Sequence, residues 1–376
     1  MRMRAALARK VGQLTIEEVE LDSPRADEVL VRMRAAGVCH SDLHTYKGEL
    51  RAMPPLVLGH EGAGVVVQVG DSVTRVKPGD RVLINWIPAC ETCPTCLSGR
   101  HNLCERLPST TFQALLPDGT TRLKTLDGLP LKHYLSVATM AEYAVVHEAS
   151  AIPFPADVPF EVAAVTGCAV ATGVGAVTNT AQARAGSPAA VLGCGGVGLS
   201  AIQGCKLVGC HPIVAVDLMD SKLAFARQLG ATHTVNGRET DPVEAMRSLT
   251  GGGPEYAFDS VGSEVTIAQA LYATRPGGTA VVMGLHAVRG QVPISPAALV
   301  LQNKRLLGSF VGSMNPRLDL PRLVELYRAG RLELDKLITK RYALDDLPRA
   351  FEDMEAGKIA RGVLVFEEAN REAAPI

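Results

Sequence analysis

The stretch "AAVLGCGGVGLSAIQGCKLVGCHPIVAVD", residues 189–217, decides the fold of this chain. Its first four residues are apolar and predict a buried strand, and a helical pattern follows the glycines. Gly193, Gly195 and Gly198 have the spacing G-x-G-x-x-G. Glycines at these positions permit a tight turn, a close approach of the backbone to a pyrophosphate, and close packing of the helix on the strand.

The second strand predicted in this stretch ends at Asp217, about 20 residues beyond the last glycine of the turn. A carboxylate there can accept hydrogen bonds from both hydroxyls of an adenosine ribose, and it repels a 2′-phosphate. The free N–H groups at the helix start favour phosphate groups. An ordinary glycine turn followed by a solvated aspartate is the alternative, but it does not explain the three glycines. The stretch therefore predicts NAD binding in preference to NADP.

The rest of the chain has two different patterns. Beyond about residue 171, strand-like runs such as "YAFDSVG" (256–262) alternate with helix-like runs such as "SKLAFARQLG" (221–230), which predicts a parallel sheet with helices on both faces. Residues 1–150 instead contain short apolar runs between turns, such as "EVLVRMRAAGV" (28–38), and predict a β-barrel-like domain. The fold class is therefore α/β, with a barrel-like domain beside a doubly wound parallel sheet.

The composition of the 376 residues is typical of a soluble globular protein, with 47% hydrophobic and 20% charged residues and a formal net charge of -1. This balance attracts neither nucleic acid nor an anionic membrane, so we expect neither as a partner. Residues 162–183 carry no charge but are small, whereas a membrane span needs about 20 strongly apolar residues, so we expect a buried helix. The absence of an evident secretory signal and the odd number of cysteines, nine, favour a cytoplasmic location.

Four of the cysteines lie close together with the spacing C-x2-C-x2-C-x7-C: Cys90, Cys93, Cys96 and Cys104. Thiolates crowded on one loop suit a tetrahedral Zn²⁺ ion with four sulfur ligands, which is a closed, structural type of site. Disulfides and free thiols are the alternatives, and a reducing compartment disfavours the first of these.

The loop "GVCHSDLHTYKG", residues 37–48, concentrates polar side chains after an apolar run and contains Cys39. His60 and Cys168 are far from it in the sequence, so the three could share a metal only if the fold brings them together. A lone cysteine is often a buried apolar residue, and a lone histidine is often an ordinary polar one. The spacing by itself leaves both interpretations open.

Several motifs occur in a characteristic order: "GHEGAG" (59–64), the four-cysteine lobe, "GCAVATG" (167–173) and "GCGGVG" (193–198). With them, residues 5–366 resemble the zinc-dependent medium-chain alcohol dehydrogenases. The long irregular segment 105–139 resembles the longer, dimeric members, and a loop of that length is expected to form a lid or an interface. The resemblance implies a GroES-like β-barrel catalytic domain with a structural zinc lobe (1–170 and 312–376) and a Rossmann domain that binds NAD (171–311).

The resemblance also implies roles for the polar loop. Cys39, His60 and Cys168 match the ligands of a catalytic zinc ion, a Cys2His set with an open fourth position. Asp42 matches the group that orients His60, and Glu61 matches a carboxylate that can approach the metal. Ser41 and His44 match a proton relay toward solvent, although a turn serine and a surface histidine are the alternatives.

Further positions match contacts to the cofactor and the substrate. The residues that match cofactor contacts are His40, Thr172, Gly193, Gly195, Gly196, Val197, Gly198, Asp217, Lys222 and Arg361. Trp86 and Tyr134 match positions that line the substrate cleft, where Tyr134 would offer a hydroxyl further out. Each of these two could instead be a packed aromatic.

The resemblance implies a reversible hydride transfer between a primary alcohol, aliphatic, allylic or aromatic, and NAD⁺. The branch of the family that acts on the glutathione adduct of formaldehyde grips glutathione with an acid and an arginine. The matching positions here are Leu50 and Pro108, which argues against that substrate. Two rival functions are a zinc-free NAD(P)H reductase, a type that lacks the ligand cysteines, and a non-catalytic relative that binds NAD. The longer members pair edge to edge through the cofactor domain, here through 279–287 and 306–312, so a homodimer is expected.

Overall fold

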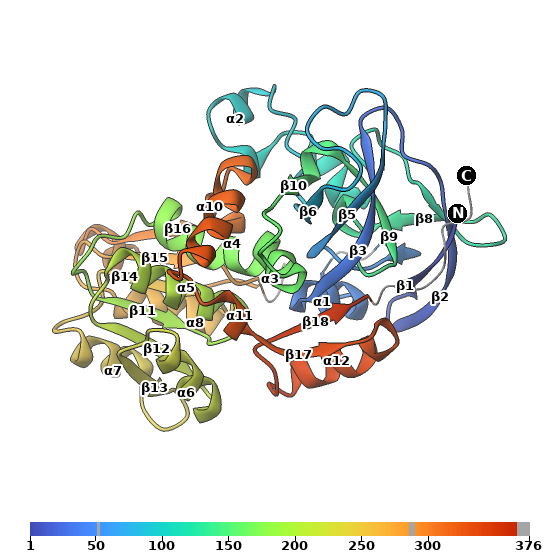
Figure 1. Cartoon of the computed structure of the whole chain (residues 1–376). Coiled ribbons are helices and arrows are strands. Elements are labelled where there is room, and N and C mark those ends of the chain that lie inside the picture. Colours follow the sequence, from blue (N-terminus) through green and yellow to red (C-terminus); the bar gives the residue numbers. More distant parts are fainter. Residues whose placement is uncertain (51–52, 286–289, 367–376) are drawn as a thin grey trace.

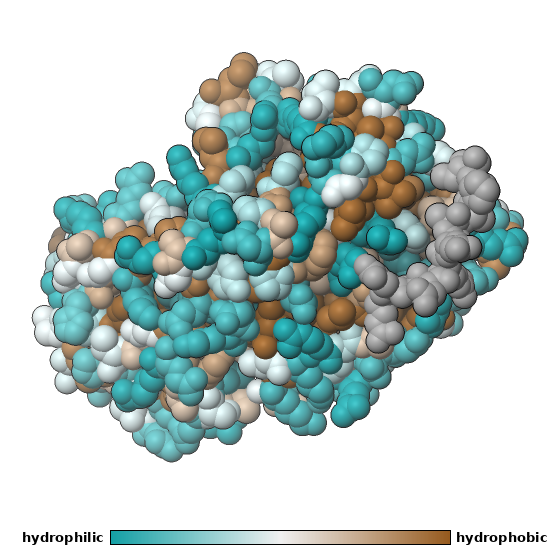
Figure 2. All heavy atoms as spheres, viewed as in Figure 1, coloured by the Kyte–Doolittle hydropathy of each residue, from teal (hydrophilic) through white to brown (hydrophobic). Residues whose placement is uncertain are grey.

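The computed structural model of the chain describes residues 1–50, 53–285 and 290–366. Two lobes lie side by side, one built on the strands of the N-terminal part and the other on the parallel sheet of residues 189–308 (Figure 1). A small lobe that contains α2 (Pro94–Leu97) projects from the first lobe toward the second (Figure 1). On the face shown in Figure 2, hydrophilic residues predominate and hydrophobic residues form small patches.

The first lobe contains a closed barrel of strands in the order β1-β2-β7-β8-β4. Their bounds are β1 Arg2–Lys10, β2 Gln13–Leu21, β4 Leu56–Val57, β7 Leu123–Lys124 and β8 Pro130–His133. The segment 105–139, expected to be irregular, thus contributes two short strands as well as turns. The reason is apolar burial, because Leu123 and Leu131 pack with Leu7 and Leu21 in one core cluster.

A second sheet of the same lobe has the order β10-β6-β5-β3-β18-β17, and β9 pairs with β3. The bounds are β3 Glu28–Val38, β5 Gly62–Val69, β6 Arg81–Ile84, β9 Tyr143–His147, β10 Ala151–Pro153, β17 Ile338–Tyr342 and β18 Arg361–Val365. The strand expected over 28–38 is confirmed as β3. Because β18 is antiparallel to β3 with Gly362 opposite Val38, the C-terminal Arg361 lies beside the end of β3.

The second lobe is the predicted parallel sheet, in the order β13-β12-β11-β14-β15-β16. Its strands are β11 Ala189–Leu192, β12 Ile213–Asp217, β13 His233–Asn236, β14 Tyr256–Asp259, β15 Thr279–Val282 and β16 Arg305–Gly308. The chain winds outward from β11 to β13 and then returns to the other side at β14. Ligands bind at such a switch of direction, beyond the carboxyl ends of the strands, and Gly193 follows β11 at this point.

Helices cover the parallel sheet and close the first lobe. Those of the parallel sheet are α5 Gly196–Val208, α6 Asp220–Gln228, α7 Pro242–Leu249, α8 Glu264–Ala273 and α9 Pro296–Val300. The C-terminal part adds α10 Pro316–Arg328, α11 Leu334–Leu337 and α12 Leu347–Glu355.

A helical segment, Phe160–Thr180, connects the two lobes and includes α3 (Phe160–Val165) and α4 (Ala171–Gly175). Within the described residues it is long and apolar enough to cross a membrane, but 89% of its most apolar window is buried inside the molecule. The expected buried helix is therefore present. Small residues are required here, since a Cβ on Gly173 would lie 2.3 Å from the carbonyl oxygen of Val197 in α5.

Candidate active site and metal centres

Three segments meet at a buried cluster of potential metal ligands. Cys39 is the N-cap residue of α1 (His40–Lys47), His60 and Glu61 precede β5, and Cys168 lies on the connecting helix. One ligand atom of each of these four residues lies within 4.8 Å of the others, and all four are buried. The fold therefore brings together the three residues that the sequence spacing could not connect.

The ring of His60 is held in one orientation. Its Nδ1 lies 3.2 Å from Oδ1 of Asp42, and the same oxygen accepts the backbone N–H of Gly59 at 3.0 Å. Although burial opposes it, the carboxylate of Asp42 raises the pKa of His60 well above its usual value, so this site favours positive charge at the ring.

The other ring nitrogen, Nε2 of His60, is buried and has no hydrogen-bond partner in the described part of the chain. A buried polar atom without a partner is costly, and a cation held between Nε2 and the sulfurs of Cys39 and Cys168 would satisfy it. Two thiols and an imidazole fixed through its far nitrogen are donors of the kind that zinc takes in catalytic sites. The residues present therefore fit a zinc ion.

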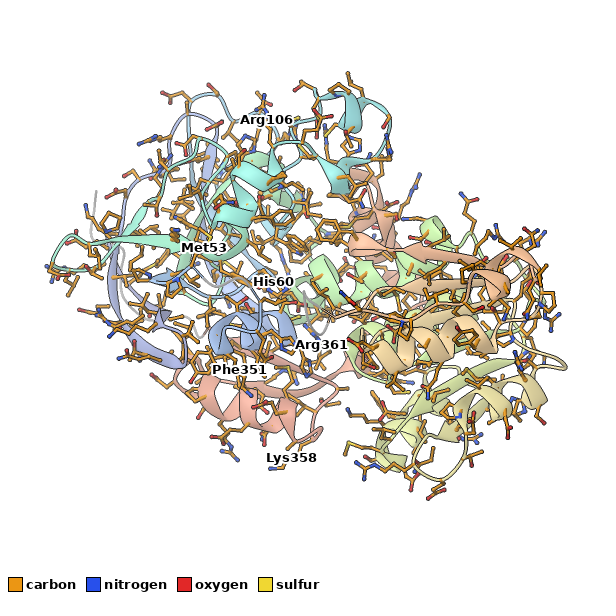
Figure 3. All side chains as sticks on the ribbon, turned by 180° about the vertical axis from the view of Figure 1, so that it is seen from behind. Met53, His60, Arg106, Phe351, Lys358 and Arg361 are labelled. Carbon is orange, nitrogen blue, oxygen red and sulfur yellow. The ribbon has the colours of Figure 1, made fainter. Side chains whose placement is uncertain are left out.

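Glu61 forms a buried ion pair with Arg361 beside this cluster. Burial raises the pKa of Glu61 to about 7, and the charge of Arg361 opposes that rise. The side chain of Arg361 also lies against the glycine turn, because a Cβ on Gly196 would be 2.4 Å from its Cδ. The side chain of Arg361, an expected cofactor contact, thus lies between the metal cluster and the glycine turn. Figure 3 shows Arg361 and His60 close to the junction of the two lobes.

The residues expected to relay a proton lie on α1. The Oγ of Ser41 is 3.8 Å from Sγ of Cys39, which places it beside the cluster. One turn later, His44 is partly exposed and contacts the carboxylate of Glu49 through Nδ1. The rings of His40 and His44 have centroids 5.9 Å apart. The chain thus offers polar groups in order from the buried cluster toward the surface.

Two aromatic rings meet His60 edge-on. The centroid of Trp86 lies 6.1 Å and that of Tyr134 5.6 Å from the imidazole centroid. The hydroxyl of Tyr134, expected further out in the substrate cleft, has two hydrogen-bond partners on α1. Its O–H donates to the carbonyl oxygen of Ser41 at 3.0 Å, and its oxygen accepts from Oγ1 of Thr45 at 2.9 Å.

Sequence reasoning missed a row of rings that continues from Trp86. The ring of Phe310 lies 5.6 Å from Trp86, and that of Phe112 lies 6.1 Å from Phe310, centroid to centroid. A groove of about 360 Å³ is lined, among the described residues, by Asn102, Leu103, Cys104, Leu107, Pro108, Phe112 and Phe310. Phe112 lies within one short 3-10 turn and Phe310 begins another. Such short turns have no periodic pattern of apolar residues that could have indicated the two rings. The scarcity of aromatic residues, 4% of the chain, was the only available signal.

The four-cysteine lobe is a second cluster, whose sulfur atoms also lie within 4.8 Å of one another. All nine cysteines lie in the described part of the chain and are free thiols, so the disulfide alternative is not realised. The sulfurs of Cys90 and Cys96 are 4.0 Å apart, and a zinc tetrahedron with Zn–S bonds of about 2.3 Å has edges of about 3.8 Å. Backbone N–H groups of Cys93 and Cys96 donate to the sulfurs of Cys90 and Cys93 at 3.3 and 3.4 Å.

The four thiols of this lobe differ in how readily they ionise. Although burial opposes it, hydrogen bonds from Thr92 and Cys93 lower the pKa of Cys90 to about 6. Burial raises the pKa of Cys96 and of Cys104 above the usual value. A zinc ion would hold all four as thiolates, and a site with four protein ligands keeps no position open for a reactant.

The glycine turn has the predicted geometry. Gly193 has a φ of +88°, and a Cβ on Gly198 would lie 1.8 Å from the carbonyl oxygen of Gly193, so neither position accepts a side chain. The carboxylate of Asp217 accepts the backbone N–H groups of Cys194 and Leu218 at 2.7 Å and that of Met219 at 3.1 Å. Asp217 therefore also fixes the turn, which the sequence did not reveal.

Three other residues expected to contact the cofactor lie on α4, α5 and α6. Val197 stands in the first turn of α5, and Thr172 is buried on α4, the segment that packs on α5. Lys222 in α6 is half-buried, with its Cε 3.2 Å from the position of a Cβ on Gly357.

Comparisons with known proteins agree with this architecture. Residues 25–156 match the alcohol dehydrogenase GroES-like domain, and residues 196–329 match the zinc-binding dehydrogenase family. The alcohol dehydrogenase class-3 of Cereibacter sphaeroides is 41% identical over 97% of this chain and 100% of its own length. The S-(hydroxymethyl)glutathione dehydrogenase of Paracoccus denitrificans is 39% identical over the same shares. The benzyl alcohol dehydrogenase of Acinetobacter calcoaceticus has a similar structure, with a TM-score of 0.93 and 31% identity over 98% of this chain and 100% of its own.

The family of the chain follows from its motifs and fold, from its two clusters of zinc ligands, and from its similarity to relatives over nearly their full length. The chain belongs to the zinc-dependent medium-chain alcohol dehydrogenase family, with a GroES-like domain, an NAD-binding Rossmann domain, and catalytic and structural zinc sites.

Proposed function

We propose that this protein catalyses the reversible oxidation of a primary alcohol to its aldehyde with NAD⁺. The observation that carries the proposal is the cluster of Cys39, His60 and Cys168, with the buried Nε2 of His60 unpartnered in the described part of the chain. Only the side chain of Arg361 separates the cluster from the glycine turn of the cofactor domain. An alcohol bound at the metal ligands would therefore lie close to a nicotinamide bound at the turn, as the transfer of a hydride requires.

In this proposal Cys39, His60 and Cys168 hold the catalytic zinc, and Cys90, Cys93, Cys96 and Cys104 hold the structural zinc. When bound, the catalytic zinc polarises the oxygen of the alcohol and lowers the pKa of its hydroxyl, and the nicotinamide takes up the hydride. Asp42 keeps Nδ1 of His60 protonated and thereby directs Nε2 into the cluster. Glu61 remains beside the cluster, held by its ion pair with Arg361.

Ser41 is proposed to take the proton from the alcohol, because its Oγ lies beside the sulfur of Cys39. His44 delivers that proton to solvent, since it stands one helical turn further out and is partly exposed. His40, Thr172, Val197, Lys222 and the glycines of the turn bind NAD. A carboxylate has about four lone pairs that can accept hydrogen bonds, and three of those of Asp217 accept backbone N–H groups. Asp217 binds the adenosine ribose with the remaining lone pair.

A second candidate function is the oxidation of the glutathione adduct of formaldehyde. The similarity to the class-3 and S-(hydroxymethyl)glutathione dehydrogenases favours it over the general alcohol substrate. The local chemistry argues against it, because Leu50 and Pro108 stand where that branch has an acid and an arginine. Pro108 lines the groove next to Phe112 and Phe310, and none of the described residues that line the groove is charged. The amide of Asn102 is already committed to the carbonyl oxygen of Phe310 at 2.8 Å.

We also propose a homodimer that pairs through the edge strand β16 of the parallel sheet. Val300 and Leu301 are strongly exposed just before this strand, which is costly for a monomer. Residues 286–289 of the expected interface lie outside the described residues. The division into 1–170 with 312–376 and 171–311, and the cytoplasmic location, stay predictions.

One panel of reactions tests the proposed function. The zinc-loaded protein is assayed for NADH and NADPH formation with primary alcohols and, separately, with formaldehyde plus glutathione. We expect NADH formation with the alcohols. A rate that requires glutathione would establish the second candidate instead, and no reduction of NAD with any substrate, despite bound zinc, would contradict both.

A further inference from the structure

The row of rings beside the metal cluster has an order that matters for substrate choice. It starts at His60 and passes through Trp86 and Phe310 to Phe112, with successive centroid distances of 6.1, 5.6 and 6.1 Å. Each successive pair is close to edge-on, at interplanar angles of 86°, 78° and 69°. Edge-on and offset arrangements at such distances are the favourable ones for aromatic rings.

The outer end of this row is open to solvent. Phe112 is 41% and Phe310 36% exposed, although large aromatic residues are normally well buried. Both line the 360 Å³ groove, whose other described lining residues include no acidic or basic side chain. The groove therefore offers an incoming molecule apolar contact and ring edges and faces but, among the described lining residues, no ionic partner.

The inner end of the row reaches the metal cluster. Trp86 is only 6% exposed, and its indole N–H has no acceptor among the described residues. Because Trp86 contacts both His60 and Phe310, it connects the groove to the metal ligands. A molecule that places its oxygen near His60 and extends outward would pass along these rings.

We propose that Phe112 and Phe310 select alcohols that carry an aromatic ring, by packing against that ring in the groove. This inference rests on the proposed function and names its substrate class. A buried aromatic pair contributes about 0.5–1.5 kcal/mol beyond the area it buries, which corresponds to a preference of about twofold to about tenfold for each ring that contacts the substrate. A saturated ring of the same size gains the apolar burial but not this additional term.

The test compares benzyl alcohol with cyclohexylmethanol, which has nearly the same shape but no aromatic ring. The variants are Phe112→Leu and Phe310→Leu, which keep apolar side chains and delete the rings. The control is Leu126→Ala, since Leu126 is similarly exposed at 48% in the same segment and does not line the groove. We expect each ring deletion to lower the ratio of kcat/KM for benzyl alcohol to that for cyclohexylmethanol about twofold to about tenfold, and the control to leave it unchanged.

A binding measurement separates failure of this inference from failure of the proposed function. Trp86 is the only tryptophan of the chain, so intrinsic fluorescence reports on the row of rings. Benzyl alcohol should change this fluorescence in the zinc-loaded protein, and Phe112→Leu should weaken the apparent affinity by the same factor as the kinetic ratio. An unchanged ratio in both variants, or equal losses for the two alcohols, overturns the inference while alcohol oxidation stands. If no alcohol reduces NAD, the fluorescence titration still decides whether the groove prefers the aromatic ring.

Discussion

Replacing Asp42 by asparagine should weaken the binding of one zinc ion and leave the binding of the other unchanged. Oδ1 of Asp42 lies 3.2 Å from Nδ1 of His60, and both side chains are fully buried. Asparagine can still accept the backbone N–H of Gly59 through its own oxygen, so the local backbone should persist. What disappears is the negative charge that holds the imidazole in the orientation that directs Nε2 into the cluster.

The expected loss follows from this single contact. Hydrogen bonds to charged groups contribute about 1.5–3 kcal/mol, and changing a carboxylate behind a histidine ligand reduces metal affinity about 10- to 100-fold. Since each factor of ten is about 1.4 kcal/mol, the two ranges agree. The four-cysteine lobe does not involve Asp42, and its zinc should be retained at the same chelator concentration.

Competition with a zinc chelator, followed by metal analysis of the protein, measures both sites at once. The Asp42→Asn variant should keep one zinc per chain at chelator concentrations that leave two on the parent. Asp353→Asn is the matched control, because Asp353 is also a buried carboxylate but hydrogen-bonds Tyr342 instead of a metal ligand. Loss of both ions in parallel, or no change in either, would refute the assigned role of Asp42.

Two further predictions concern the cofactor and acid stability. The Asp217→Gly variant should have a lower ratio of kcat/KM for NAD to kcat/KM for NADP, because it lacks the charge that repels a 2′-phosphate. An unchanged ratio would show that Asp217 only fixes the turn through its three N–H contacts. Burial, with help from the charge of Arg122, lowers the pKa of His133 in the folded chain to about 3. In the unfolded chain the pKa of this histidine is about 6.5. Below pH 6.5 the unfolded chain therefore binds a proton at His133 that the folded chain does not bind, and the folded state loses stability. When the pH falls from 7 to 5, the free energy of unfolding of the parent should therefore decrease by about 2 kcal/mol more than that of the His133→Gln variant, as measured by urea titration. Equal decreases in the two proteins would show that His133 does not have the lowered pKa in the folded chain.

Local sequence patterns predicted those parts of the fold in which neighbouring residues determine the outcome. The glycine turn of 193–198, β3 and the four-cysteine lobe each lie within a short stretch, and the structure has them where the patterns indicate. The strands β7 and β8 were missed because they are short and are held by pairing and apolar burial against strands distant in the sequence.

The candidate site was predictable only in part, because much of it consists of contacts between distant segments. The ion pair of Glu61 with Arg361 exists because β18 returns to β3 late in the chain. Phe112 and Phe310 meet although about 200 residues separate them, and short turns give no periodic signal. A resemblance gives the position of Tyr134 but not the hydrogen-bond partners of its hydroxyl on α1.

Cys39, His60 and Cys168 are proposed to hold the zinc on which alcohol oxidation depends. The most direct measurement is NADH formation from benzyl alcohol by the Cys39→Ser variant, together with its zinc content and its affinity for NAD. We expect loss of NADH formation, binding of NAD within about twofold of the parent, and retention of the zinc in the four-cysteine lobe. Undiminished NADH formation by Cys39→Ser would contradict the assignment of Cys39 as a ligand of the catalytic zinc.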